Sequence, residues 1–409
     1  MKLSAMQIQA IVDATKTPTP EQVRVVEAPR RPLLVVAGAG SGKTETMSMR
    51  VLWLLANHPD LTPASILGLT FTRKAAGELG DRLRERIRLL SREMPQMRER
   101  LDEDPVALTY NSFAERIVSE HGMRIGIDPD FAMLSEAGAL DLMTQIVEAW
   151  PTDLDETLSP AGVVGKILHL AGEIAEHGYT VETAREALEE FGRELEQVGR
   201  GNDVARNVID ANHRRLAFLG PIEAYQQRKR DMGVLDFSDQ LVLATRIVRE
   251  APAVRAALRD EFRAVLLDEF QDTSVIQMEL LSTLFGDHAV TAVGDPNQAI
   301  YGWRGASASS LETFLERFQT GVAEENQTLT LSTAWRNDVS ILDAANRVAA
   351  PLREVASYQQ GKDALKAQSP VLVPRPGAGQ GRVEIAYTQA YDQALAAMVD
   401  FVQRVRSQP

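Results

Sequence analysis

A glycine-rich segment at residues 37–44, AGAGSGKT, has the residue types that hold phosphate groups. It lies between an apolar run at 33–37 and a helical pattern at 43–56, so backbone N–H groups and a helix N-terminus can surround an anion. Lys43 is expected to neutralise the β- and γ-phosphates of a nucleotide, and Thr44 is expected to bind Mg²⁺. A purely structural glycine turn would not need this lysine and threonine at this spacing.

The segment departs from the G-x-x-x-x-G-K-[ST] pattern at one position, because Ala37 stands where the first glycine is usual. Three glycines remain, at positions Gly38, Gly40 and Gly42. They leave the loop free to adopt positive φ angles and to approach a nucleotide closely.

Two adjacent carboxylates end an apolar run at 265–274, VLLDEFQDTS. Consecutive residues that leave a strand diverge, so Asp268 can hold the Mg²⁺ shell while Glu269 faces the γ-phosphate and activates the attacking water. An isolated Asp-Glu pair is common at strand ends. After a phosphate-binding loop, the pair favours nucleotide hydrolysis.

The runs around these motifs alternate between apolar strands and amphipathic helices, which is typical of an α/β fold with a parallel sheet. The predicted strands are 33–37, 66–72, 264–270 and 289–295. The predicted helices of this part are 43–56, one that ends at about 90, and 238–262. The stretch from about 115 to 220 has no clear strand run and favours a helical insertion.

A third segment begins near residue 325. Its predicted elements are a strand at 328–332, a helix at 338–352, a strand at 383–388 and a last helix, with a Pro/Gly-rich stretch at 369–381.

The composition is that of a globular protein, with 409 residues of which 44% are hydrophobic. No run approaches a membrane span and the start lacks a signal peptide, so we expect a cytoplasmic protein without a membrane partner. The absence of cysteine excludes disulfides, thiolate metal sites and a cysteine nucleophile. The net charge of −13 argues against a nucleic-acid partner, but segment 71–100 carries nine basic against five acidic residues. That segment is either a local phosphate groove or a solvated helix face.

With these motifs, the chain resembles superfamily 1A DNA helicases of the UvrD, PcrA and Rep type from about residue 17 to its C-terminus. Seven ordered blocks carry the resemblance: TPEQ (19–22), AGAGSGKT (37–44), TFTRKAA (70–76), TYNSFA (109–114), LLDEFQDTS (266–274), VGDPNQAIYGWRGA (293–306) and LSTAWRN (331–337). Chance is a poor explanation for that order. The wording GLTFTRKAAGEL, TYNSFAERI and AWRN is most similar to the motor subunits of actinobacterial AdnA/AdnB-type helicase–nucleases.

The resemblance implies a RecA-like P-loop NTPase domain with a parallel sheet, an inserted all-helical subdomain and the first part of a second RecA-like domain. It assigns 1–114 and 223–324 to the first domain, 115–222 to the insertion, and 325–409 to the start of the second domain.

The resemblance also assigns roles around ATP and Mg²⁺, the implied cofactors. Gln22 would hydrogen-bond the adenine and Trp335 would stack on it. Gln298 would sense the γ-phosphate and Arg336 would act as an arginine finger, since charge on the γ-phosphoryl oxygens rewards a donor that arrives when the cleft closes. The implied nucleotide-binding residues are Gln22, Ala37, Gly38, Ala39, Gly40, Ser41, Gly42, Lys43, Thr44, Trp335 and Arg336, and the metal-binding residues are Thr44 and Asp268.

Single-stranded DNA is the implied track. Aromatic rings suit it, because every base has a π-face and stacking tolerates any sequence. The implied DNA-binding residues are Phe71, Arg73, Tyr110, Asn111, Phe113, Tyr301, Trp303 and Arg304. For each aromatic taken alone, burial in the core is the commoner role.

Two residues depart from the family pattern. Asn111 stands where a histidine is common, and Glu45 follows the P-loop threonine where several relatives carry an arginine, so any nucleotide contact of that arginine is missing or supplied elsewhere. Motifs V and VI of the family and a nuclease signature are not found in the chain. We therefore expect this form, made alone, to fold but not to unwind duplex DNA.

The expected function is that of an ATP-dependent DNA helicase or translocase that moves 3′ to 5′ in repair or recombination. Its expected partners are single-stranded DNA, 3′-tailed duplex DNA and a second helicase–nuclease subunit. Two alternatives stay open: a nuclease subunit, and a non-motor ATP-binding regulatory subunit. Intact Lys43, Glu269, Gln298 and Arg336 argue against a degenerate ATPase, and stimulation of ATP hydrolysis by single-stranded DNA would exclude a simple switch.

Overall fold

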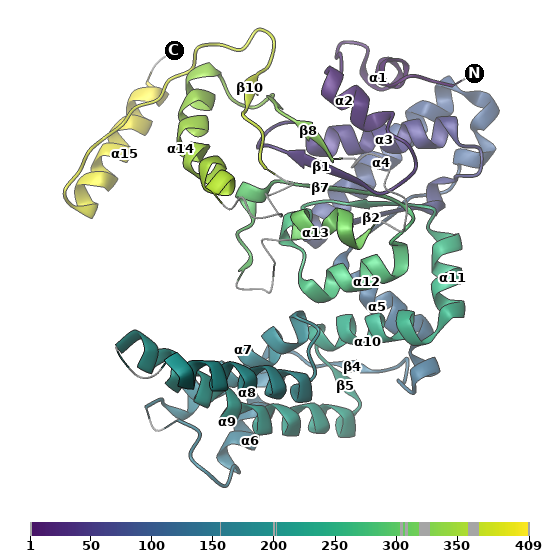
Figure 1. Ribbon diagram of the computed structural model, residues 1–409. Coiled ribbons are helices and arrows are strands. Elements are labelled where there is room, and N and C mark those ends of the chain that lie inside the picture. Colours follow the sequence, from purple (N-terminus) through teal and green to yellow (C-terminus); the bar gives the residue numbers. More distant parts are fainter. Residues whose placement is uncertain are drawn as a thin grey trace.

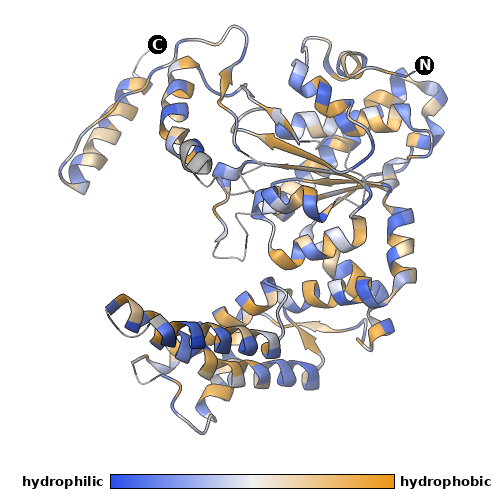
Figure 2. Ribbon diagram, viewed as in Figure 1, coloured by the Kyte–Doolittle hydropathy of each residue, from blue (hydrophilic) through white to orange (hydrophobic). Residues whose placement is uncertain are grey.

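Six parallel strands in the order β3-β2-β6-β7-β1-β8 form the main sheet of the computed structural model (Figure 1). The structure describes residues 2–155, 157–198, 201, 203–302, 306, 310–318, 328–358 and 368–407. The strands are β1 (Leu33–Ala37), β2 (Ile66–Thr70), β3 (Val106–Thr109), β6 (Ala264–Leu267), β7 (Ala289–Gly294) and β8 (Thr328–Leu331). Their apolar composition is visible in Figure 2 and is expected when both faces of a parallel sheet are covered.

Alternate residues of the four inner strands face two different cores. On β1, Leu34 and Val36 belong to one cluster of buried residues, and Leu33 and Val35 belong to the other. Helices α1 (Ala5–Asp13), α2 (Pro20–Val26), α3 (Lys43–Asn57) and α4 (Arg73–Glu93) cover one face. Helices α5 (Tyr110–His121), α10 (Phe237–Glu250), α11 (Pro252–Glu261), α12 (Val275–Phe285) and α13 (Ser310–Arg317) cover the other (Figure 1).

The predicted helical insertion has a core of its own. Its helices are α6 (Glu136–Glu148), α7 (Pro160–Glu176), α8 (Val181–Val198) and α9 (Asp203–Met232). Fully buried Ile167 and Leu219 lie at its centre. A two-strand pair, β4 (Ala132–Met133) with β5 (Val234–Leu235), joins the two ends of the insertion. Helix α5, which the expected boundary near 115 would divide, packs in the core of the main sheet.

The strand at 328–331 differs from the sequence-based expectation, which placed it at the start of a second domain. β8 pairs in parallel with β1, with Thr328 opposite Leu34, and is therefore an outermost strand of the main sheet. The physical reason is twofold: β8 hydrogen-bonds the open side of β1, and Leu331 completes the core that contains Leu33.

The predicted strand at 383–388 is wrong. These residues adopt no regular secondary structure, and the side chains of Ile385 and Tyr387 are exposed. A strand requires a neighbour for its backbone groups, and the structure gives this segment none among the described residues. The remaining elements are β9 (Thr333–Ala334), α14 (Val339–Tyr358), β10 (Val373–Pro374) and α15 (Tyr391–Arg406). No described helix is both long and apolar enough to span a membrane.

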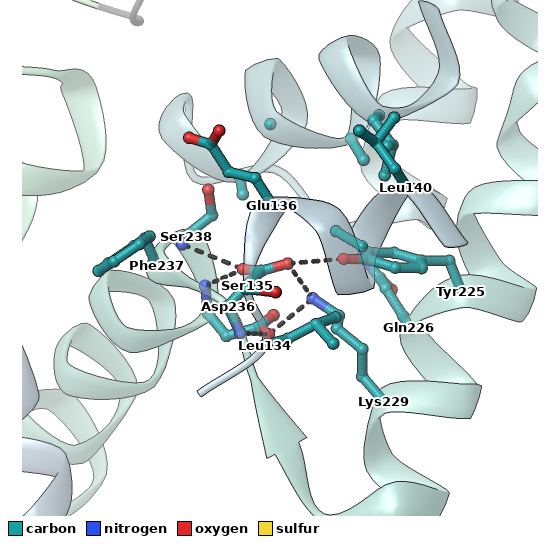
Figure 3. A pocket seen from close by; sticks show the side chains of 16 residues that line it. Leu134, Ser135, Glu136, Leu140, Tyr225, Gln226, Lys229, Asp236, Phe237 and Ser238 are labelled. Atoms are coloured by element: carbon teal, nitrogen blue, oxygen red, sulfur yellow. Dashed lines mark hydrogen bonds and ion pairs between the residues drawn. The ribbon is translucent and has the colours of Figure 1, made fainter. Parts of the chain in front are cut away.

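A buried lysine fastens the insertion to the main domain. Figure 3 shows Lys229 of α9 directed at two carboxylates at the start of α10, with Nζ at 2.5 Å from Asp236 Oδ2 and 2.6 Å from Asp239 Oδ2. The Tyr225 hydroxyl also donates to Asp236, and backbone N–H groups of Ser238 and Asp239 donate to its other oxygen. These groups line a cavity of about 280 Å³ and hydrogen-bond one another. We therefore regard the cluster as part of the fold.

The lysine balances carboxylates that burial disfavours. Burial and the charge of Asp236 raise the pKa of Asp239. Burial also acts to raise the pKa of Asp236, but the charge and hydrogen bond of Lys229 outweigh it and lower that pKa. Without the ammonium group, two negative charges would face each other with little water around them.

We expect Lys229→Met to lower the free energy of unfolding by up to about 3 kcal/mol, because it leaves the two carboxylates without a cation. The low end of the range for a broken buried pair applies, since the side chains of Asp236 and Asp239 are 23% and 26% exposed. Urea unfolding at pH 7 measures the effect. Adding Asp239→Asn should recover part of the loss, and the exposed Lys16→Met is the control. An unchanged unfolding midpoint in Lys229→Met would contradict this account.

Candidate nucleotide site and DNA groove

The carboxyl ends of the parallel strands meet at one edge of the main sheet, and the predicted chemical residues follow these ends. Parallel strands place the loops that follow them at the same edge, where α/β proteins bind ligands. In chain order, the edge receives the P-loop after β1, Phe71 after β2, Tyr110 after β3, Asp268 and Glu269 after β6, and Asp295 to Gln298 after β7. Residues far apart in sequence are thus neighbours in space.

The P-loop joins the end of β1 to the N-terminus of α3. Ala37 is still a strand residue: it pairs with Leu331 and its methyl group is fully buried, which accounts for alanine where the pattern has glycine. Gly42 is the N-cap of α3 and has a φ of 82°, which only glycine adopts without strain. A Cβ at this position would also lie 3.1 Å from Gln22 Nε2.

The residues expected to contact the nucleotide surround this loop. Gln22 is buried, and its Oε1 accepts from the backbone N–H of Thr19 in the cap of α2, which leaves its Nε2 next to Gly42. The backbone N–H of Trp335 donates to the Gly40 carbonyl at 2.8 Å. A Cβ built on Gly40 would lie 3.0 Å from Arg336 Cβ, so Arg336 also lies against the loop.

The two adjacent carboxylates differ in environment. Asp268 is 8% exposed, and burial together with the charge of Glu269 raises its pKa to about 6. Glu269 lies in the left-handed region with φ 49°, and among the described residues no other non-glycine has a positive φ. Such backbone strain persists where the surroundings hold it, and it clusters at active sites. Lys43 Nζ lies 4.0 Å from Glu269 Oε2.

The groups at this edge fit a triphosphate with a divalent cation. Lys43, the N-terminus of α3 and the Thr44 hydroxyl in its first turn suit phosphate and Mg²⁺. The Ser41 hydroxyl is buried and has no hydrogen-bond partner within the described part of the chain. Asp268 offers a buried carboxylate as an oxygen ligand, and the partly exposed Glu269 lies next to it.

A hydrogen-bond network that the sequence analysis missed connects the ends of β6 and β7. Gln271 Nε2 donates to Glu269 Oε2 at 2.8 Å, and its Oε1 accepts from the backbone N–H of Asp295 at 3.1 Å. Asp295 Oδ2 accepts from Gln298 Nε2 at 2.6 Å. Burial and the charge of Glu269 also raise the pKa of Asp272 to about 6. These residues lie in the recognised blocks 266–274 and 293–306. The spacing within each block does not predict hydrogen bonds between the two blocks.

A groove of about 640 Å³ lies between these loops and the insertion. Phe71, Arg73 and Asn111 line it, as expected for the DNA track. The rings of Phe71 and Tyr301 lie 4.6 Å apart between centroids, which forms an aromatic pair at its side. Asn111 Oδ1 accepts from Gln277 Nε2 of α12 at 3.2 Å.

Two aromatics expected to bind DNA do not present their rings to solvent. Phe113 is fully buried and packs against Phe262 and Phe285, so the expectation of a DNA contact is wrong for it. Tyr110 lines the groove but is 3% exposed, and its hydroxyl donates to the Asp268 carbonyl at 3.1 Å. Its ring therefore supports the Asp268 loop and is not free to stack on a base.

Two further expected DNA-binding residues, Trp303 and Arg304, lie outside the described residues. Glu45, which follows the P-loop threonine where several relatives carry an arginine, forms an ion pair of 2.5 Å with Arg86 Nη2 of α4. The carboxylate at position 45 thus draws an arginine from the neighbouring helix to the first turn of the P-loop helix.

Comparison with known proteins identifies the family of the chain and several relatives. Residues 18–319 match the N-terminal domain of UvrD/REP helicases. The chain is 30% identical over 329 residues to DNA helicase II of Escherichia coli K12, which covers 80% of this chain and 39% of that protein. It is 28% identical over 329 residues to ATP-dependent DNA helicase PcrA of Leuconostoc citreum, which covers 80% and 38%, respectively. The chain spans about two-fifths of the length of these relatives.

Proposed function

The chain belongs to the UvrD/REP helicase family, and on that premise we propose that it hydrolyses ATP to move along single-stranded DNA in repair or recombination. The observation that carries the proposal is the meeting of Lys43 and Glu269 at one edge of the sheet, 4.0 Å apart, beside a groove lined by Phe71 and Arg73. A nucleotide site and a candidate DNA groove therefore share the same set of strand ends.

In the proposed hydrolysis, Lys43 and the N-terminus of α3 hold the β- and γ-phosphates. Thr44 and Asp268 would hold Mg²⁺, which would supply positive charge to offset the charge of the phosphates. Glu269 accepts a proton from the attacking water, as a general base does.

The remaining contacts would select and complete the nucleotide. Gln22 and Trp335 would select adenine, because both lie beside Gly42. Gln298 and Arg336 would donate to the γ-phosphate as charge develops on it.

The finer parts of the proposal rest on sequence similarity. We propose 3′-to-5′ movement, action on 3′-tailed duplex DNA and a cytoplasmic location. The wording of GLTFTRKAAGEL, TYNSFAERI and AWRN supports a motor of the AdnA/AdnB helicase–nuclease type with a second subunit as partner. A regulatory ATP-binding subunit without motor activity is the alternative, and it is favoured if single-stranded DNA does not stimulate ATP hydrolysis.

We expect Lys43→Ala to lower kcat/KM for ATP by about 10²–10³-fold, because it removes the charge partner of the phosphates. ATP hydrolysis with and without single-stranded DNA is the measurement. Lys16→Ala is the matched control, since Lys16 is exposed and pairs with Asp13. Undiminished hydrolysis in Lys43→Ala would overturn the site assignment.

Glu269→Gln is expected to behave differently, because it preserves shape while it removes the base. Binding of a fluorescent ATP analogue should persist while kcat falls by about 10²–10⁴-fold. If both binding and hydrolysis are lost, Glu269 is a structural carboxylate.

For the groove, we expect Phe71→Ala to weaken binding of single-stranded DNA by about 1–3 kcal/mol with little dependence on base sequence. Titration of labelled oligonucleotides of different composition tests this. Tyr391→Ala, which removes an exposed aromatic of α15, serves as the control. An affinity equal to that of the unmodified protein would assign Phe71 to packing against Tyr301 instead.

A further inference from the structure

A segment from beyond α14, residues 368–374, lies across the P-loop. A Cβ built on Gly38 would lie 2.3 Å from Leu372 Cδ2, so the leucine side chain touches the glycine directly. The side chain of Asn346 on α14 both donates to and accepts from the backbone of Leu372, at 2.9 Å each way. The N–H of Val373 donates to the Ser332 carbonyl at 2.9 Å. One side of the segment is therefore bonded to α14 and β9, and its other side contacts the P-loop.

The same segment inserts a hydroxyl group into the end of β7. Ser369 Oγ donates to Asp295 Oδ1 at 2.6 Å, and the two residues are 8% and 3% exposed. A buried carboxylate needs donors in place of the water it has lost. Asp295 receives them from Ser369, from the backbone N–H of Asn297 and from the Gln298 amide. Ser369 therefore helps to fix the rotamer of Asp295.

Asp295 in turn connects the two groups proposed to act on the γ-phosphate. Its Oδ2 orients the Gln298 amide, and its backbone N–H orients Gln271, which donates to Glu269. Ser369 thus holds the Asp295 side chain, and the backbone N–H of the same residue leads through Gln271 to Glu269. Loss of the Ser369 hydroxyl would leave a buried carboxylate oxygen with one donor fewer and free Asp295 to turn.

We propose that Ser369 is a positioning residue for ATP hydrolysis, which sets Gln298 and Glu269 when the 368–374 segment is seated on the P-loop. The inference rests on the proposed function. It assigns to this segment, which lies outside the recognised blocks, the task of linking the position of α14 to the groups proposed to act on the γ-phosphate. A hydrogen bond that only supported the fold would have no reason to change turnover separately from binding.

The test compares Ser369→Ala with Ser369→Thr, which keeps the hydroxyl group. With saturating single-stranded DNA, Ser369→Ala should lower kcat by about ten- to a hundredfold, because the lost donor served a charged group. The KM for ATP and the affinity for a fluorescent ATP analogue should stay within about twofold. The reason is that the Ser369 hydroxyl bonds Asp295, which is not one of the residues expected to bind the nucleotide. Ser369→Thr should retain most of the rate.

The matched control is Ser65→Ala. Ser65 is also 8% exposed and its hydroxyl donates to the Thr62 carbonyl at 2.7 Å, but it precedes β2, at the opposite edge of the sheet. It should leave kcat unchanged. Thermal unfolding of all three variants shows whether each is folded.

Three results would overturn the proposal: an unchanged kcat in Ser369→Ala, an equal loss in Ser369→Ala and Ser369→Thr, or a parallel loss of binding and turnover. These differ from failure of the proposed function, in which the unmodified protein itself, like Lys43→Ala, hydrolyses no ATP. If the unmodified protein hydrolyses no ATP, the proposed role of Ser369 in hydrolysis is also excluded.

Discussion

The parallel direction of all six strands in the main sheet is the constraint on which the site depends. Parallel strands need crossover segments, and here helices cover both faces, so the four inner strands, β1, β2, β6 and β7, are buried on both sides and are largely apolar. The polar residues are therefore displaced to the strand ends. Since those ends share one edge, Lys43, Glu269 and Gln298 converge although they lie on three separate segments. The pattern that stabilises the sheet also assembles the site.

Three acidic residues, Asp268, Glu269 and Asp272, lie close together at these strand ends, which destabilises their charged forms. Asp268 and Asp272 are held in surroundings that raise the pKa of each to about 6, and in both the charge of Glu269 adds to the effect of burial. The fold also holds Glu269 in a strained backbone conformation. Perturbed carboxylates beside a lysine and a helix N-terminus are typical of a site that receives a cation and an anion together.

The sequence predicted the features that depend on local pattern. The strands that became β1, β2, β6 and β7 have continuous apolar runs, and the P-loop and the Asp268–Glu269 pair are defined by spacing. The failures depend on distant partners: the strand at 328–331 joined the first sheet because β1 had an open side, and the residues at 383–388 met no neighbouring strand. Phe113 shows the same limit, because only the packing of α5 against Phe262 and Phe285 decides that its ring is buried. Ser369 has no local signal at all.

The acidic charge of the chain is compatible with the proposed DNA track. Two of the nine basic residues in segment 71–100 serve the fold: Arg86 pairs with Glu45, and Arg100 donates to the carbonyls of Leu55 and Leu61. Arg73 remains in the groove, whose lining also includes Glu173 of the insertion. A groove of this composition would repel a phosphate backbone on the insertion side and hold it only locally elsewhere. Base stacking on Phe71 and Tyr301 would then supply much of the grip, and because stacking is tolerant of sequence, such a track suits a motor that must release every base it passes.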